Sequence, residues 1–490
     1  MTDGGQRGQD SEIALPGFGL NIAGQYPRFY RRMVAVLEWQ NKHVPLLFRL
    51  EMVLFRTIIV IVDAVLWILL GNLALTGVAP GKLSRGYSSY RGSSRSYNSR
   101  ELVNEIAQLN RKLERYTPNI AVISYLTFAQ RCVETSTALA ADAYVAHGVQ
   151  SLPTASILAN EQGGKYYCDC IETPSFFDRA LPVNWDVTNT HFLDRAFESY
   201  LRHADGILTV GWTLADQLRK LHNNVAVIPN YRYAETLAPN DWLREKCGVS
   251  EDTDLVLSLN TVTAGLDVVL AALALLPPSV HLVTVGRFAP VGYRETCEKY
   301  AAEQGVLERF HCLDPLPYKD LTATISMASA GLIVLDPSIK NVQVSLPNRI
   351  FDYMFAGVPI CSPLIPDIAR IIADENIGGI VTDLSPAGWA ETISSVLQEK
   401  DKLRDNAVTA SKKYIWESVE DDLFESLGRP ASVCYVGASN LRENNRTMRM
   451  ARSLVARGVE VTVCYRCRPG ETPNDAAVLD DGIKFVSLAN

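Results

Sequence analysis

Short apolar segments that alternate with helical segments are the feature that most constrains the fold of this chain. From Glu101 onward the segments IAVISY, KYYCDC, GILTV, VAVIP, LVLSL, HLVTVG, GLIVL and PICSP are typical of buried strands. Consecutive strands joined by helices pair in parallel, because a parallel crossover needs a dozen or more residues. The pattern therefore predicts an α/β fold in which helices cover parallel sheets.

The composition is that of an ordinary globular protein. The chain has 490 residues, of which 47% are hydrophobic and 21% are charged, enough for two or three domains. A net charge of −7 gives no reason to expect nucleic acid as a partner. The N-terminus lacks the residue order of a secretory signal and the ten cysteines are scattered, so we expect a reducing, cytoplasmic compartment.

Two cysteine pairs leave two interpretations open. Cys168 and Cys170 form one pair, and Cys464 and Cys467 form the other. Four thiolates from two pairs can bind zinc if the pairs converge. Both pairs sit at the ends of apolar strands, where cysteine commonly serves as a small hydrophobic residue, which favours core packing. We therefore expect no metal.

The segment Leu346–Ile372 has the pattern of a helix, a short apolar strand and a second helix. Pro347 suits the first helical position, and Gly357 suits the end of the first helix. Arg349 follows in the first turn. Free N–H groups and a forked guanidinium at a helix start can hold an anion such as a diphosphate.

These residues resemble a known family. PNRIFDYMFAGVP is similar to the donor-site helix of family 4 glycosyltransferases, which reads P-(N/S)-K-L-F-E-Y-M-A-x-G-x-P. Three more segments resemble the family: Ala204–Asn230, Ser279–Arg287 and Tyr318–Pro337. The resemblance covers most of the chain from about residue 117. It implies two Rossmann-like domains facing across a cleft (the GT-B fold), and sugar transfer with retention of configuration.

The resemblance places the nucleotide-sugar donor, whose sugar is linked to UDP or GDP, on the second domain. Ligands of such sheets bind beyond the carboxyl ends of the strands. The candidate nucleotide-sugar-binding residues there are Asn260, Thr261, Gly286, Arg287, Pro347, Asn348, Arg349 and Asp352, with Asp336 and Lys340 beside them. Asp352 matches the glutamate that binds the ribose. Val344 replaces the family's other glutamate, and the loop NTVTAGLD lacks the usual basic residue. Arg287 and Arg349 would then neutralise the diphosphate without a cofactor. The alternative for Arg349 is a solvated arginine at a helix start, and the alternative for Arg287 is a partner in a surface salt bridge.

On the acceptor side, CDCIETP resembles the family's D-x-H-E segment, with Ile171 in place of the histidine. Asp169 and Glu172 are therefore the candidate catalytic residues, which would orient an acceptor hydroxyl or accept its proton. A capping or structural role is the alternative for both acids. Family membership implies that the leaving phosphate helps to deprotonate the acceptor, so positioning and charge stabilisation would supply most of the catalysis.

The C-terminal segment Pro430–Asn490 resembles the start of such an enzyme rather than its end. ENNRTMRMARSLVARGVEVTV is similar to the family's opening D-x-R-x-x-R-x-A pattern, with Asn444 in place of the aspartate and Arg446 matching the arginine. Gly437, Asn444 and Arg446 are therefore candidate residues of an acceptor-side loop. One interpretation is a circular permutation, in which a helix at Lys412–Leu427 leads back to the first domain. The other is a fragment of a tandem enzyme, cut after its second copy begins.

The predicted organisation has four parts. We expect a flexible N-terminus at 1–24 and an acceptor-side Rossmann-like domain at 25–235. That domain includes an apolar helical insertion at 25–81 and a basic low-complexity loop at 82–100. The donor-binding domain covers 236–427, and 428–490 supplies the first strands and helix of an N-terminal-type domain, completing the acceptor-side sheet.

The apolar insertion suggests contact with a membrane. Thr57–Leu70 carries a single charge, Asp63, and basic residues flank the insertion on both sides. This pattern favours helices lying on an anionic cytoplasmic leaflet over a buried insertion or a true span. The loop at 82–100 is a mobile surface loop, or a basic patch for lipid head groups or a polyanionic acceptor.

The sequence thus predicts a cytoplasmic glycosyltransferase, peripheral at the inner face of the cell membrane. It would transfer sugar to a glycan or lipid-linked acceptor in bacterial surface polysaccharide biosynthesis. Two rivals remain: a nucleotide-sugar epimerase of the same fold, and a catalytically degenerate, membrane-docked scaffold, which Val344 and Ile171 suggest.

Overall fold

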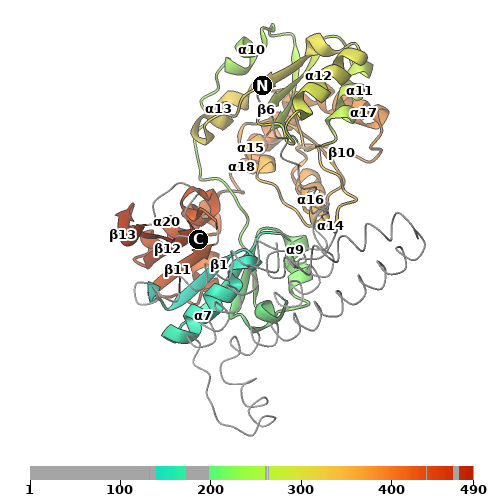
Figure 1. Ribbon diagram of the computed structural model, residues 1–490. Coiled ribbons are helices and arrows are strands. Elements are labelled where there is room, and N and C mark those ends of the chain that lie inside the picture. Colours follow the sequence, from blue (N-terminus) through green and yellow to red (C-terminus); the bar gives the residue numbers. More distant parts are fainter. Residues whose placement is uncertain are drawn as a thin grey trace, which may run out of the picture.

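The computed structural model describes residues 132, 139–172, 198–259, 262, 264–437, 439–466 and 474–488. These residues form two sheets, each with its own helices, seen as a lower and an upper group in Figure 1. The α/β fold with parallel sheets that the sequence predicts is confirmed. The expectations for 1–24, 25–81, 82–100 and the strand IAVISY lie outside the described residues.

The first sheet has eight strands in the order β13-β14-β12-β11-β1-β2-β3-β4. All neighbours are parallel except β13 and β14. The strands are β1 (Ala143–His147), β2 (Lys165–Cys170), β3 (Gly206–Thr209), β4 (Val225–Val227), β11 (Ser432–Gly437), β12 (Glu460–Arg466), β13 (Asn474–Asp480) and β14 (Ile483–Leu488).

The C-terminal segment supplies half of this sheet. β11 pairs in parallel with β1, with Val145 opposite Tyr435, and β12 and β14 extend the sheet beyond it. The ends of the two strands are tied as well, because the Asp142 N–H donates to Ser432 Oγ at 3.0 Å. Segments almost 300 residues apart in sequence thus lie side by side, in red and cyan in Figure 1.

The second sheet has six parallel strands in the order β10-β9-β8-β5-β6-β7. These are β5 (Asp254–Leu259), β6 (Val280–Val285), β7 (Phe310–Leu313), β8 (Ala330–Leu332), β9 (Ile360–Pro363) and β10 (Gly378–Val381).

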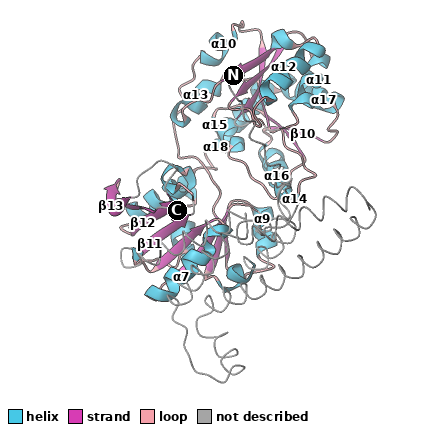
Figure 2. Ribbon diagram, viewed as in Figure 1, coloured by secondary structure: helices cyan, strands magenta, loops and turns pink. Residues whose placement is uncertain are grey.

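Helices lie on the sheets and between them (Figure 2). Those of the first sheet are α7 (Leu152–Gln162), α9 (Trp212–Leu218), α19 (Glu420–Ser426) and α20 (Asn445–Ala456). Those of the second are α10 (Trp242–Cys247), α11 (Leu266–Leu275), α12 (Tyr293–Glu303), α13 (Leu321–Ile325), α14 (Lys340–Gln343), α15 (Arg349–Phe355), α16 (Pro366–Glu375), α17 (Pro386–Gln398) and α18 (Lys400–Ser411). Single 3₁₀ turns are η2 (Val149–Ser151), η3 (Leu307–Arg309), η4 (Tyr318–Asp320), η5 (Trp416–Ser418) and η6 (Leu441–Glu443).

One apolar cluster runs through both groups. It includes Tyr435 of the first sheet, Leu257 of the second and Tyr231 between them. The ring of Tyr231 meets that of Phe351 edge to face, with centroids 4.9 Å apart. A second cluster fills the opposite face of the first sheet and contains Cys168, Cys170 and Cys464, so these cysteines pack in the core.

Two chain segments cross side by side between the groups. Arg232 forms a parallel bridge with Ile415, and the Trp416 N–H donates to the Arg232 carbonyl at 2.7 Å. The prediction of one helix at Lys412–Leu427 is wrong: only η5 and α19 are helical there, because Ile415 is extended against Arg232. In the described part of the chain, no helix has the length and apolar character that crossing a membrane requires.

Candidate active site

The helix α15 is fixed to the second sheet by one buried hydroxyl. Tyr353 Oη accepts from the Leu259 N–H at 3.0 Å and lies 3.0 Å from the Leu257 carbonyl oxygen and 3.1 Å from that of Leu332. Leu259 ends β5 and Leu332 ends β8, two neighbouring strands in the middle of the sheet. A buried tyrosine hydroxyl that lacks such partners costs free energy. α15 is therefore held at the carboxyl edge of the sheet, where the sequence predicts it.

The ends of α15 agree only in part with the prediction. The helix begins at Arg349, two residues after Pro347, and the preceding residues form a turn in which the Ile350 N–H donates to the Pro347 carbonyl. The predicted glycine end is confirmed: Gly357 has φ 66°, and the Val358 N–H donates to the Tyr353 carbonyl at 2.8 Å. This left-handed ending is available to glycine at little cost.

Arg349 is the basic residue at the start of α15. Its Nε atom is buried and has no hydrogen-bond partner among the described residues. Burial lowers the pKa of its guanidinium, against the opposing effect of Tyr353 and Asp352. A buried donor without a partner costs free energy, and an anion that approaches this side chain would remove that cost.

Asp352 occupies the position for which the resemblance implies a ribose contact. Its carboxylate is buried and accepts from Arg232 Nη1 at 2.7 Å. Burial raises the pKa of Asp352, and the charge of Arg232 opposes that rise. Arg232 also lies 3.2 Å from Glu235 and 4.3 Å from the centroid of the Tyr318 ring. The carboxylate is thus engaged with the segment that joins the two groups.

Asn348 and Asn230 meet just before α15. Asn348 is exposed and its side chain does not cap the helix. Instead its Oδ1 accepts from Asn230 Nδ2 at 2.6 Å. Asn230 follows β4 of the first sheet, so this contact joins the start of α15 to the other group.

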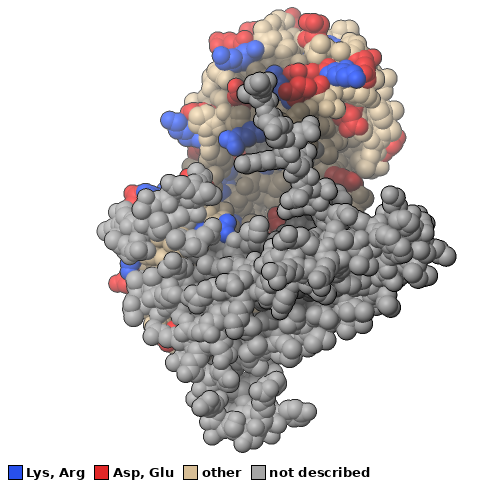
Figure 3. All heavy atoms as spheres, in the orientation of Figure 1, with Lys and Arg blue, Asp and Glu red and all other residues tan. Residues whose placement is uncertain are grey.

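The remaining donor-side candidates lie in loops. Gly286 and Arg287 follow β6; Arg287 is exposed and makes no ion pair with any residue that the structure describes. Asp336 accepts from the Ser338 N–H at 2.8 Å, and Lys340 begins α14. Asn260 and Thr261 lie outside the described residues. Figure 3 shows basic and acidic side chains interspersed on the visible face of this group.

Asp169 lies at the carboxyl end of β2 with no exposed surface. Arg446 Nη2 and Nε donate to its Oδ1 at 2.7 and 2.9 Å, and Arg446 Nη1 donates to the Ile228 carbonyl at 2.6 Å. Burial would raise the pKa of Asp169, but the charge of Arg446 and the hydrogen bonds of His147 and Arg446 hold it at about 2. This arrangement suits Asp169 to positioning its neighbours, since so weak a base seldom takes a proton at neutral pH.

Glu172 lies two residues beyond β2 and is exposed. Its carbonyl oxygen accepts from Cys170 Sγ at 3.2 Å. The two predicted acids therefore differ in environment: Asp169 is buried and ion-paired, and Glu172 faces outward.

His147 is a polar residue of this edge that sequence reasoning missed. It ends β1 directly opposite Asp169 in the strand register, and its Nδ1 lies 3.2 Å from Asp169 Oδ2. Its Nε2 lies 3.2 Å from Asn444 Nδ2. In a neutral imidazole, Nδ1–H can donate a hydrogen bond to Asp169 while Nε2 accepts one from the side-chain NH₂ of Asn444. The pairing register of two strands, which the sequence does not show, was the missing signal.

The predicted acceptor-side loop residues lie at the same edge of the sheet as His147, and Asn444 contacts it. Asn444 precedes α20, and its Oδ1 accepts from the Thr447 N–H at 2.9 Å, a normal N-cap contact. Gly437 ends β11, and a Cβ there would lie 2.5 Å from Leu441 Cδ2, so glycine allows η6 to pack closely. The structure thus brings together Asp169, Asn444 and Arg446 from distant parts of the sequence.

The chain is similar to glycosyltransferases in sequence. It is 27% identical over 182 residues to D-inositol 3-phosphate glycosyltransferase of Xylanimonas cellulosilytica, a match covering 36% of this chain and 42% of that relative. With the equivalent protein of Corynebacterium efficiens it is 25% identical over 145 residues, covering 29% and 33%. The chain therefore spans less than half the length of the curated relatives it matches. No family model matches the chain.

In structure it is similar to Anabaena HepE in complex with UDP and glucose. The TM-score is 0.52 at 16% identity, over 61% of this chain and 81% of that one. This similarity shows a shared fold, the GT-B fold that the resemblance implies.

Proposed function

We propose that this chain is a glycosyltransferase that moves a sugar, with retention, from a nucleotide-diphosphate sugar to a glycan or lipid-linked acceptor. The observation that carries the proposal is Arg349, whose buried Nε has no partner among the described residues, at the carboxyl edge of the second sheet. The sequence relatives, which are D-inositol 3-phosphate glycosyltransferases, support it. UDP or GDP is the proposed carrier, and a step in bacterial surface polysaccharide biosynthesis is the proposed setting.

The geometry supports the following proposed roles of the site residues. Arg349, with Arg287, neutralises the diphosphate as it leaves, and Asn348 and Gly286 line the donor. Asn260 and Thr261, which lie outside the described residues, are proposed from the sequence to join them. Glu172 faces the acceptor. Asp169 holds Arg446 and His147 in place beneath it. The departing phosphate receives the proton of the acceptor hydroxyl, so the weakly basic carboxylate of Asp169 does not need to accept it.

Calorimetric titration with UDP and GDP tests the donor site. We expect micromolar binding of one of them, and Arg349→Ala to weaken it about ten- to a hundredfold, the cost of a charge-assisted hydrogen bond. Arg294→Ala is the matched control, because Arg294 pairs with Glu298 on the surface of the same group. A folded protein that binds neither nucleotide would contradict the proposal.

Two rival functions make different predictions. A nucleotide-sugar epimerase binds the nucleotide but interconverts sugars without an acceptor, so product analysis with radiolabelled UDP-sugars separates it from a transferase. A degenerate scaffold binds no nucleotide.

We propose further that the chain order is circularly permuted, in preference to a fragment of a tandem enzyme. The parallel pairing of β11 with β1 supports this proposal. We also propose peripheral attachment to the inner face of the cell membrane through 25–100, motivated by the apolar and basic pattern of that sequence. Flotation of the full chain with anionic, but not with neutral, vesicles is the expected result.

A further inference from the structure

Helix α20, from the C-terminal segment, buries two arginines and exposes a third. Arg446 and Arg449 are 4% and 5% exposed, whereas Arg452 is half exposed and pairs with Asp481. Arg446 has the carboxylate of Asp169 as its counter-ion. Arg449 makes no ion pair with a described carboxylate, so its burial needs another explanation.

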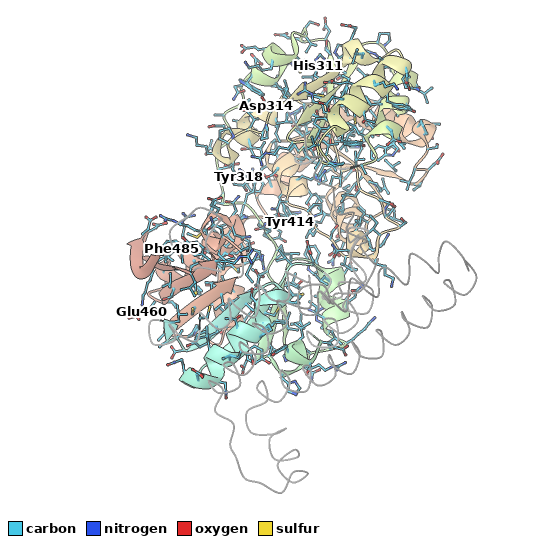
Figure 4. All side chains as sticks on the ribbon, viewed as in Figure 1. His311, Asp314, Tyr318, Tyr414, Glu460 and Phe485 are labelled. Carbon is cyan, nitrogen blue, oxygen red and sulfur yellow. The ribbon has the colours of Figure 1, made fainter. Side chains whose placement is uncertain are left out.

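Arg449 contacts the side-chain amide of Asn230, the backbone carbonyl of Asn230 at 3.4 Å, and aromatic rings. Its Nη2 donates to Asn230 Oδ1 at 2.5 Å, and its guanidinium carbon lies 5.5 Å from the centroid of the Trp416 ring. Burial lowers the pKa of Arg449, and Tyr318 opposes that change. Tyr318 lies at the level where the two groups meet (Figure 4). Arg449 thus belongs to the first sheet but reaches the junction with the second.

The direction of the hydrogen bonds along this path is fixed by chemistry. A guanidinium only donates, so Asn230 must turn its carbonyl oxygen to Arg449 and its NH₂ away from it. That NH₂ donates to Asn348 Oδ1 at 2.6 Å. Asn348 must in turn present its own NH₂ on the side away from Asn230. Arg449 therefore sets the orientation of an exposed amide that directly precedes Arg349.

We propose that Arg449 is a positioning residue for the donor nucleotide: through Asn230 it holds Asn348 with its NH₂ donors facing the diphosphate beside Arg349. This inference rests on the proposed function, and it adds a dependence of donor binding on the first sheet. A donor NH₂ stabilises a phosphate oxygen, whereas a carbonyl oxygen in its place repels it.

The substitution Asn230→Asp keeps the contact with Arg449 but removes the hydrogen bond that Asn230 donates to Asn348. An aspartate gives Arg449 a better partner, a carboxylate, so a structural contact is kept or strengthened. It cannot donate to Asn348, however, so the Asn348 amide turns over and presents its carbonyl oxygen to the phosphate. We expect Asn230→Asp to weaken UDP or GDP binding about tenfold or more, with no loss of thermal stability. Arg449→Met is expected to weaken it similarly.

Arg452→Met, on the exposed side of the same helix, is the matched control and should leave nucleotide affinity unchanged. Wild-type affinity in Asn230→Asp overturns the relay while leaving the proposed function intact, provided that Arg349→Ala still loses binding. If the wild-type protein binds neither nucleotide, the proposed function fails and the relay fails with it. If Arg449→Met does not fold, Asn230→Asp alone decides.

Discussion

Asp169 and Arg446 form an ion pair from which solvent is excluded, and such a pair is stable only while both partners are present. We expect Asp169→Asn to lower the free energy of unfolding by about 3–5 kcal/mol, because it leaves the guanidinium buried without a counter-ion. Urea denaturation measures this loss. Asp216→Asn, which removes an exposed partner of Arg219, is the control and should cost less than about 1 kcal/mol. Equal effects would contradict the argument.

Two histidines of the second sheet predict a pH dependence. His281 Nδ1 and His311 Nε2 lie 3.0 Å apart, so only one hydrogen fits between them. Burial lowers the pKa of both; Arg309 lowers that of His281 further, and His281 that of His311. Since each pKa lies below its unfolded value, the stabilisation is present above about pH 6.5 and is lost as the pH falls through the lowered values.

The slope can reach about 1.4 kcal/mol per pH unit for each extra proton that the unfolded chain binds. Urea midpoints between about pH 7.5 and pH 5.5 measure it. We expect His311→Gln to flatten this dependence, and an unchanged slope in that variant would speak against the pair as its source.

At the scale of single residues, the sequence revealed which side chains could serve in the site but not which of them contact each other. Asp169, Asn444 and Arg446 were identified separately by resemblance, but their contacts join positions 277 or more residues apart, and periodicity does not extend over such distances. His147 was missed for the same reason: it matters because of the strand opposite it. The ion pair between Asp352 and Arg232 was hidden because Arg232 lies in an irregular segment without a pattern.

Elements are positioned by a few polar contacts, and Tyr353 is the clearest case. We expect Tyr353→Phe to lower the free energy of unfolding by about 1–3 kcal/mol, since the Leu259 N–H loses its buried acceptor. Nucleotide affinity should fall as well, because α15 loses its anchor to β5 and β8. Chemical denaturation and titration with the nucleotide check both. Tyr414→Phe, which removes a partly buried bond to Glu375, should have a smaller effect on stability and none on affinity.

Local sequence rules predicted which helices and strands form better than they predicted where those helices and strands begin and end. The strands β11 and β14 and the helix α20 follow the apolar pattern of the C-terminal segment closely. The end of α15 at Gly357 could be predicted because a left-handed backbone conformation at a helix end favours glycine. The structure of 412–419 could not be predicted in this way, because the extended pairing of Ile415 with Arg232 overrides the helical propensity of this segment.

At the scale of the whole molecule, the strand order makes a rearrangement of the chain testable. β11 lies next to β1, and β12 and β14 follow beyond it, so the family-like order requires only that residue 488 be connected to β1 by a crossover. That crossover spans three strand spacings of about 4.8 Å and the length of one strand, which the segment 117–142 can cover. We therefore expect a chain in which 430–490 precedes 117–429 to fold with native-like circular dichroism.

The rearranged chain should also have the same affinity for UDP or GDP as the original chain, since the contacts among Arg449, Asn230 and Asn348 do not depend on where the chain begins. Its matched control has the same order but carries Tyr435→Asp, which places a charge inside the sheet between β1 and β12 and should prevent folding. Calorimetry and thermal denaturation of both chains give the answer. If residues 117–490 in their original order fold and the rearranged chain does not, the order of segments, and not only the register of β11 on β1, is needed to assemble the first sheet.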